Sequence, residues 1–236
     1  MPQSKSKVKS KQRVADHGEV FTGAREVKAM CNLVSAECLR IDSRFLEPAC
    51  GEGNFLEEIL RRKLGVVRKK YLRSPYDWER NSLLALGSLY GVDILTDNCE
   101  LCRRRLYRIW ERAYRAACKE ECNEETRRAA RFILERNIVC GNALSLRCVD
   151  GEQRDTDAPI VFSEWSFPQN NSFLHRKDYT FAELLEEKPK RRRAAVQQSL
   201  FEEDASDGEG NFVQEYVCHY RRLGEEERGG EEREKG

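Results

Sequence analysis

The sequence is poor in histidine, proline and methionine, and it contains no long apolar run. Its 236 residues include 3 His, 6 Pro and 2 Met. No segment approaches the roughly 18 consecutive apolar residues that a spanning helix needs, so the pattern excludes a membrane protein. No apolar segment of roughly 7–15 residues follows the basic start of the chain, which argues against a secretory signal. We therefore expect a cytoplasmic protein.

Charged residues are abundant but unevenly distributed. They make up 35% of the chain, and 42 Lys and Arg nearly cancel 41 Asp and Glu. Residues 1–13 are basic, and a second basic block at 188–193 directly precedes an acidic segment. Such segments bury too little apolar surface to offset chain entropy, so we expect disorder over 1–13 and over most of 188–236. The expected folded domain then spans residues 14–187.

Ten cysteines raise the question of a metal site. The spacing Cys99-x2-Cys102, followed by Cys118-x3-Cys122, resembles a four-thiolate zinc site. However, Cys102 belongs to the apolar stripe of an amphipathic helical pattern, and no Gly or Pro stands between residues 97 and 140 to make the tight turns of a zinc knuckle. Reduced free thiols are the favoured interpretation, and zinc is the alternative.

Short apolar segments alternate with amphipathic helical patterns. Strands are expected at residues 44–47, 90–94, 137–140 and 159–162. Helical patterns cover residues 27–38, 55–64, 83–89 and about 96–136, and Thr22 is the expected N-cap of the first helix. This alternation favours a doubly wound α/β fold, in which helices cover both faces of a mostly parallel sheet.

Polar residues stand where three of the expected strands end, which is where open α/β sheets bind ligands. Glu47 ends the first strand, and Gly51 and Gly53 in the next loop permit close backbone approach to a ligand. Asp93 ends the second strand, where an acid typically accepts hydrogen bonds from ribose hydroxyls. Asn142 ends the third, where an amide can read an adenine edge. The alternative is a plain turn, with Asp93 capping a helix.

The loop after the first strand is similar to a known motif. Residues 45–56, FLEPACGEGNFL, closely resemble the first motif of adenine-specific (N6) DNA methyltransferases, the S-adenosylmethionine loop (D/E)-P-A-C-G-x-G-x-F-L. Residues 18–22, GEVFT, resemble the preceding motif of circularly ordered members, and 91–94 and 141–144 match the ribose and adenine motifs in order. The resemblance covers roughly residues 16–165, and residues 41–64 are similar to bacterial modification-subunit-like methyltransferases.

The resemblance implies a Rossmann-like domain that uses S-adenosylmethionine to methylate adenine in DNA, within a restriction–modification system. It implies that Glu47 holds the amino-acid end of the cofactor, Asp93 the ribose hydroxyls and Asn142 the adenine amino group. The cofactor-binding residues that it implies are Val20, Phe21, Thr22, Glu47, Ala49, Cys50, Gly51, Gly53, Phe55, Asp93, Ile94, Asn142 and Ala143.

Three departures from the family pattern matter. Gly23 replaces the usual Pro, Asn142 replaces the usual Asp, and the catalytic tetrapeptide (N/D)-P-P-(Y/F) occurs nowhere in the chain. In the family that tetrapeptide accepts the target amine and stacks on the flipped base. By position alone, Ser163, Glu164 and Trp165 are the predicted catalytic residues, with Glu164 as acceptor and Trp165 or Phe167 as stacking ring. The alternative is an aromatic strand end packed on the core.

Three hypotheses follow. The first is a DNA adenine methyltransferase whose target choice depends on a separate specificity subunit, because little foldable sequence follows residue 187. The second is a methyltransferase-like protein that binds the cofactor without catalysis. The third is a basic nucleic-acid-binding accessory protein with a vestigial cofactor fold.

Overall fold

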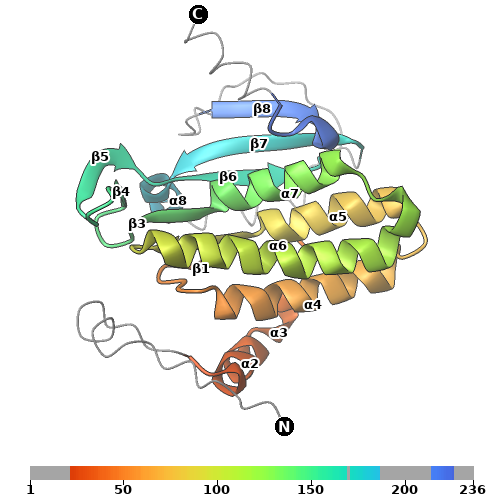
Figure 1. The fold of residues 1–236 in the computed structure, drawn as a ribbon, viewed down its shortest axis with the longest axis horizontal. Coiled ribbons are helices and arrows are strands. Elements are labelled where there is room, and N and C mark those ends of the chain that lie inside the picture. The colour runs from red at the N-terminus through yellow and green to blue at the C-terminus, as the bar shows by residue number, and fades with distance from the viewer. Residues whose placement is uncertain (1–21, 169–170, 187–213, 226–236) are drawn as a thin grey trace, which may run out of the picture.

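The computed structural model describes residues 22–168, 171–186 and 214–225 (Figure 1). The predicted basic arm at 1–13, the basic block at 188–193 and the acidic segment after it lie outside these ranges. None of the described helices is long and apolar enough to cross a membrane. In chain order the elements are α2 (Ala24–Leu33), α3 (Ser35–Cys38), β1 (Phe45–Glu47), α4 (Asn54–Tyr71), α5 (Pro75–Gly87), β2 (Leu89–Asp93), α6 (Thr96–Cys118), η1 (Lys119–Glu121), α7 (Glu124–Asn137), β3 (Ile138–Asn142), β4 (Arg147–Val149), β5 (Asp155–Pro159), β6 (Val161–Ser166), β7 (Phe173–Thr180), α8 (Phe181–Glu186), β8 (Gln214–His219) and η3 (Tyr220–Arg222).

The fold is mixed α/β, and the first three predicted strands are confirmed as β1, β2 and β3. They pair in parallel in the order β1-β2-β3, with Glu47 opposite Gly91 and Asp93 opposite Cys140. Because the strands are parallel, their carboxyl ends lie at one edge of the sheet. Antiparallel β4 and β5 extend the sheet beyond β3, so it is mixed rather than parallel throughout.

The fourth predicted strand is placed differently. Residues 159–162 are divided between the end of β5 and the start of β6, and β6 belongs to a second, antiparallel sheet, β6-β7-β8. The start of β6 lies at the carboxyl end of β3, because a Cβ on Gly141 would meet Ile160 at 2.6 Å. Its far end lies before β2, where a Cβ on Gly87 would meet Trp165 at 2.6 Å. In consequence β6 runs opposite to β1–β3.

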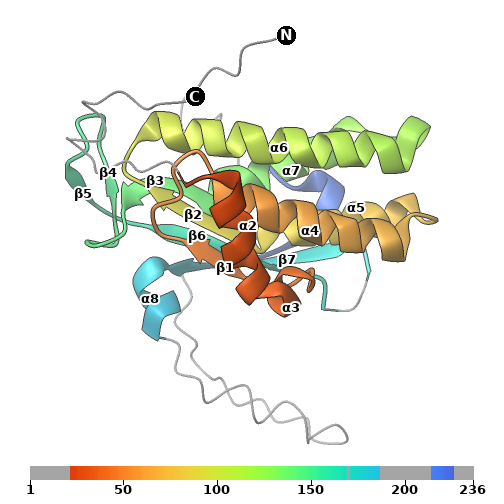
Figure 2. The same cartoon turned by 90° about the horizontal axis from the view of Figure 1, so that it is seen from below.

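The two faces of the parallel strands are covered by different layers. Leu89 faces the main core, which is built largely from α4 to α7. Tyr90 and Val92 point the other way and pack with Phe162 of β6 and Phe181 of α8, the Tyr90 and Phe162 ring centroids being 5.3 Å apart. Figure 1 shows α6 and α4 below β3 and β6 to β8 above it, and Figure 2 shows α8 on the side away from α6. The second cover is therefore a strand layer and a short helix, instead of the predicted second layer of helices.

Side-chain caps explain the helix boundaries that periodicity missed. The polar stretch after residue 64 continues α4 to Tyr71, and α5 then begins at Pro75. Ser74 caps α5, since its Oγ accepts the Asp77 N–H at 3.2 Å, and proline at the first helical position needs no N–H partner.

The long cysteine-bearing helical pattern is two helices, α6 and α7. They are separated at residues 119–123, where Asn123 caps α7 by accepting the Thr126 N–H at 2.8 Å. At the start of the domain, the N-cap of α2 is Gly23, without a side-chain cap, so the prediction that Thr22 caps this helix is wrong.

The folded unit extends past residue 187, because β8 and η3 close it. Glu79 of α5 is fully buried and accepts the Tyr114 and Tyr220 hydroxyls, each at 2.5 Å. The Arg221 guanidinium donates to the same carboxylate at 2.8 Å. Residues 214–225 therefore pack on the same core, beyond the predicted boundary at residue 187.

A buried lysine ties the segments that precede β1 and β2 to α4. The Lys63 ammonium donates to the Ile41 carbonyl at 3.1 Å, to the Ser43 carbonyl, and to Ser88 Oγ at 2.6 Å. These three acceptors match its three donors. Burial of the side chain lowers the pKa of Lys63 from 10.5 to about 7.

The Glu79 carboxylate should be essential for stability. Glu79→Gln is expected to lower the unfolding free energy in urea by about 2–4 kcal/mol, because charge-assisted bonds are lost and the new amide donor faces other donors. The matched control is Glu135→Gln on the exposed face of α7. A change below about 0.5 kcal/mol in Glu79→Gln, the usual range for surface substitutions, would contradict this role.

Lys63 should make stability rise with pH. Its pKa is lower in the folded state, so the unfolded chain binds the extra proton above about pH 7, and the unfolding free energy increases with pH. Between pH 7 and 9 the wild type should gain about 2 kcal/mol relative to Lys63→Met. Urea unfolding of both proteins across this range measures the difference. Parallel curves would show that Lys63 titrates alike in both states.

Candidate functional site

The loop between β1 and α4 is fastened to the end of β2 by backbone bonds. The Cys50 N–H donates to the Val92 carbonyl at 2.8 Å, and the Gly53 N–H closes the turn on the Cys50 carbonyl at 2.8 Å. The Gly51 N–H donates to Asp93 Oδ2 at 2.8 Å. The two strand ends that the sequence predicted as a ligand site are thus joined into one unit.

The two glycines of this loop are required for different reasons. Gly51 has φ of 51° and no heavy atom within 4 Å of a Cβ built on it, so its backbone faces open space. Gly53 has φ of 82°, and a Cβ there would lie 2.5 Å from Cys102 Sγ of α6. Gly51 therefore leaves the loop accessible, whereas Gly53 allows it to pack tightly on α6.

Asp93 is largely engaged by the protein itself. Its Oδ1 accepts the Leu95 N–H at 2.9 Å and Asn98 Nδ2 at 3.1 Å, while Oδ2 accepts from Gly51. A carboxylate offers about four acceptor positions, so about one remains for a ligand. Asp93 therefore stabilises the turn before α6 without capping the helix, and it can still accept one ribose hydroxyl more readily than two.

Glu47 stands half-buried at the end of β1. Burial raises the pKa of its carboxyl, and a hydrogen bond from the Ala49 backbone opposes that rise. A positively charged ligand group placed beside it would favour the ionised form. The position fits the ammonium end of an amino-acid ligand.

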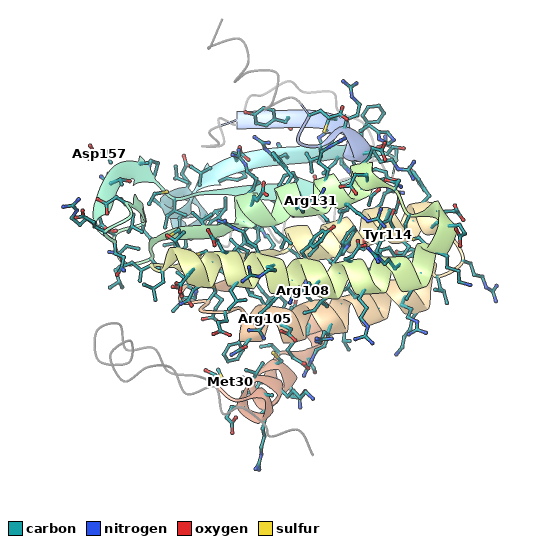
Figure 3. All side chains as sticks on the ribbon, in the orientation of Figure 1. Met30, Arg105, Arg108, Tyr114, Arg131 and Asp157 are labelled. Atoms are coloured by element: carbon teal, nitrogen blue, oxygen red, sulfur yellow. The ribbon has the colours of Figure 1, made fainter. Side chains whose placement is uncertain are left out.

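Arg105 of α6 clamps the same loop, and the sequence did not point to it. Its Nη1 donates to the Glu52 carbonyl and to Asn54 Oδ1, both at 2.9 Å, and its Nη2 reaches Glu57 Oε2 at 2.6 Å. Figure 3 shows Arg105 between α6 and α4. Asn54 Nδ2 also lies 3.4 Å from the Thr22 carbonyl, which brings the predicted covering segment to the loop. Val20 and Phe21 of that segment lie outside the described residues.

Thiols fill the space beneath the loop. Cys50, Cys99 and Cys102 are all buried, and contact with the Cys102 thiol raises the pKa of Cys50 far above its ordinary value. All three are therefore packing residues, and the Cys50 thiol is protonated.

The alternative zinc site is not formed. Cys102 and Cys118 are 16 residues apart on α6 (118 − 102 = 16), about 24 Å at roughly 1.5 Å per residue. Cys99 and Cys102 thus lie near the start of α6, whereas Cys118 ends it and Cys122 follows η1. The part of the chain that the structure describes contains no cluster of His, Cys, Asp and Glu that could hold a metal.

The remaining predicted cofactor residues lie at the same edge but are partly engaged. Asn142 Oδ1 accepts the Leu144 N–H at 3.0 Å, and its Nδ2 donates to Asp155 at 3.0 Å. Ala143 packs on the smaller core cluster, and Phe55 packs on the main one. Ile94 is half-buried just past the end of β2.

The three predicted catalytic residues are not brought to this edge. Ser163 is 1% exposed and donates to Asp178 at 2.6 Å, and Trp165 is 5% exposed and packs beside Gly87. Glu164 pairs with Arg44, which precedes β1, at 3.1 Å. Because β6 runs in reverse, these side chains lie near the starts of β1 and β2. The length of β2, about 16 Å at roughly 3.3 Å per residue, separates Trp165 from the loop.

Comparison with known proteins gives one curated relative. The chain is similar to a candidate type II restriction enzyme and methyltransferase of Methanocaldococcus jannaschii, with 33% identity over 107 residues. The match covers 43% of this chain and 8% of the relative, so the chain corresponds to a small part of that protein. No family model and no solved structure matches the chain.

The loop glycines should respond unequally to substitution. Gly53→Ala combines a left-handed φ with the clash at Cys102, and is expected to cost about 2–4 kcal/mol of unfolding free energy. Gly51→Ala meets open space and should cost about 1 kcal/mol. Urea unfolding of both variants measures this difference. Adding Cys102→Ala to Gly53→Ala should recover part of the loss, and no recovery would refute the clash.

Proposed function

We propose that this chain binds S-adenosylmethionine at the carboxyl edge of β1–β3 and serves a DNA methyltransferase that acts on N6 of adenine. The observation that carries the proposal is the 2.8 Å bond from the Gly51 N–H to Asp93. It joins the loop that resembles the S-adenosylmethionine motif to the acid expected at the ribose. Similarity to the candidate restriction enzyme and methyltransferase of Methanocaldococcus jannaschii supports the same class of activity.

The residues at this edge fit the proposed cofactor. S-adenosylmethionine, when bound, supplies a methyl group on a sulfonium. The half-buried Glu47 would hold its ammonium, and the open backbone at Gly51 would allow close approach. Asp93 would accept one ribose hydroxyl, and the second lone pair of Asn142 Oδ1 would accept from the adenine amino group. Thr22 would lie at the covering side through its contact with Asn54.

Ser163, Glu164 and Trp165 lie away from the proposed cofactor edge, so the proposal assigns the target base to other groups. Methyl transfer between bound reactants depends chiefly on their alignment, so a receiving group has to lie at the cofactor edge. We propose that this group, like the choice of DNA sequence, comes from a partner subunit or from residues outside the described ranges.

A second candidate is a protein that binds the cofactor without transferring a methyl group. The absence of the catalytic tetrapeptide from the sequence and the burial of Ser163 and Trp165 favour it. Both candidates share the same cofactor site, so binding and transfer must be measured separately.

The decisive measurement is calorimetric titration with S-adenosylmethionine. The wild type should bind, and Asp93→Ala should bind at least about tenfold more weakly, because a hydrogen bond to a charged group is worth about 1.5–3 kcal/mol. Asp157→Ala on the exposed β5 is the matched control and should bind like the wild type. No binding by the wild type would refute the cofactor site.

Transfer is then tested with methyl-labelled cofactor and unmethylated duplex DNA. Label on adenine N6 that is lost in Asp93→Ala supports the methyltransferase. Cofactor binding without label supports the second candidate. The third hypothesis, a vestigial cofactor fold, predicts neither.

A further inference from the structure

A groove between α4 and α6 is lined by cations and lies away from the cofactor edge. Its rim carries Arg61 and Arg68 of α4 and Arg112 of α6, and its floor is apolar, with Leu64, Ile109 and Ala113. The hollow measures about 650 Å³, and a second hollow that shares Gly65 and Arg68 continues it toward the end of α4. Small residues on both helices, among them Gly65 and Ala116, leave this space open.

Cations are frequent in the α4 segment that lines the groove and in the α6 segment that leads into it. Residues 59–76 contain seven Lys and Arg and no Asp or Glu, and residues 101–110 contain four Arg and no acid. Several of the exposed cations have no recorded ion pair or side-chain hydrogen bond among the described residues, namely Arg68, Lys69, Arg73, Arg104, Arg108 and Arg112. We call these six residues the α4–α6 basic surface. Figure 3 shows Arg108 on the face of α6 turned to the viewer.

The cations at the end of α4 have an ordinary structural explanation. Positive side chains in the last turn interact favourably with the helix dipole, and Arg68 and Lys69 stand there. Their position alone therefore indicates no ligand.

The arginines of α6 lack that explanation. Arg104, Arg108 and Arg112 lie in the middle of the helix at intervals of four residues, about 6 Å apart along its axis. Like charges at this spacing destabilise a helix by about 0.2–0.5 kcal/mol per pair. Arg115, also exposed on α6, forms an ion pair with Glu111 at 2.5 Å. Arg104, Arg108 and Arg112 form no such pair with a described residue. An anionic partner that binds along these three arginines would reduce the electrostatic repulsion between them.

We propose that the α4–α6 basic surface binds the phosphodiester backbone of duplex DNA. Charge complementarity carries the proposal, since a column of arginines with an extended basic flank matches a row of phosphates better than a single small anion. The groove begins about 10 Å from the start of α4, at Arg61, and leads away from the cofactor loop. DNA held there is duplex flanking a target, gripped without reading bases. This contact requires no cofactor, so DNA binding at this surface can be tested independently of S-adenosylmethionine binding and methyl transfer.

The test is fluorescence anisotropy with a labelled duplex of about two helical turns and no S-adenosylmethionine. The full chain is compared with the triple variant Arg104→Gln, Arg108→Gln, Arg112→Gln. The matched control removes three cations that already have acidic partners on other faces, by Arg40→Gln, Arg154→Gln and Lys177→Gln. Melting temperatures of all three proteins establish that they are folded.

The triple variant should bind the duplex at least about tenfold more weakly than the control variant. The slope of log affinity against log salt concentration should be shallower for the triple variant than for the control variant, by about 2–3. The reason is that each phosphate contact contributes about 0.9 to this slope. Triple and control variants that bind within twofold of each other would overturn the proposal. A competition experiment gives a second test, in which polyglutamate and unlabelled duplex of equal charge each compete with the labelled duplex for the wild type. Equal inhibition by the two would also overturn the proposal, because the surface would then bind an acidic protein as readily as DNA.

Discussion

The Asp93 carboxylate is the constraint on which the candidate site depends. It accepts the Gly51 N–H from the β1–α4 loop and the Leu95 N–H and Asn98 amide at the start of α6. One side chain therefore sets the relative positions of the first loop, the end of β2 and the second long helix. A ligand that used the last acceptor of Asp93 would meet an edge that is already ordered, so little further entropy need be lost there on binding.

Local signals predicted the parts of the fold that are governed by local physics. Strand ends at Glu47, Asp93 and Asn142 follow from short apolar runs that polar residues and glycines terminate, and the structure confirms all three. The cluster of Glu47, Gly51 and Asp93 also follows, because parallel strands bring their carboxyl ends together. Boundaries set by side-chain caps, such as Ser74 and Asn123, were missed because polar stretches hide them from a periodicity argument.

Long-range placement could not be predicted in the same way. Residues 159–162 are predicted as the fourth strand of the alternating strand–helix pattern, but nothing local indicates which sheet they join or in which direction they run. Residues 161 and 162 begin β6, which pairs with Phe173–Thr180, and the buried hydrogen bond from Ser163 to Asp178 stabilises that pairing. Likewise, Arg105 and Lys63 act on residues tens of positions away, and an isolated basic residue in a helix gives no sign of such partners.

Because β8 packs on the domain, the charged segment before it connects two structured parts of the chain and is not a free tail. Residue 186 ends α8 and residue 214 begins β8, and Glu79 holds Tyr220 and Arg221 just beyond. The basic block at 188–193 and the acidic segment after it are therefore attached to the folded body on both sides, not on one.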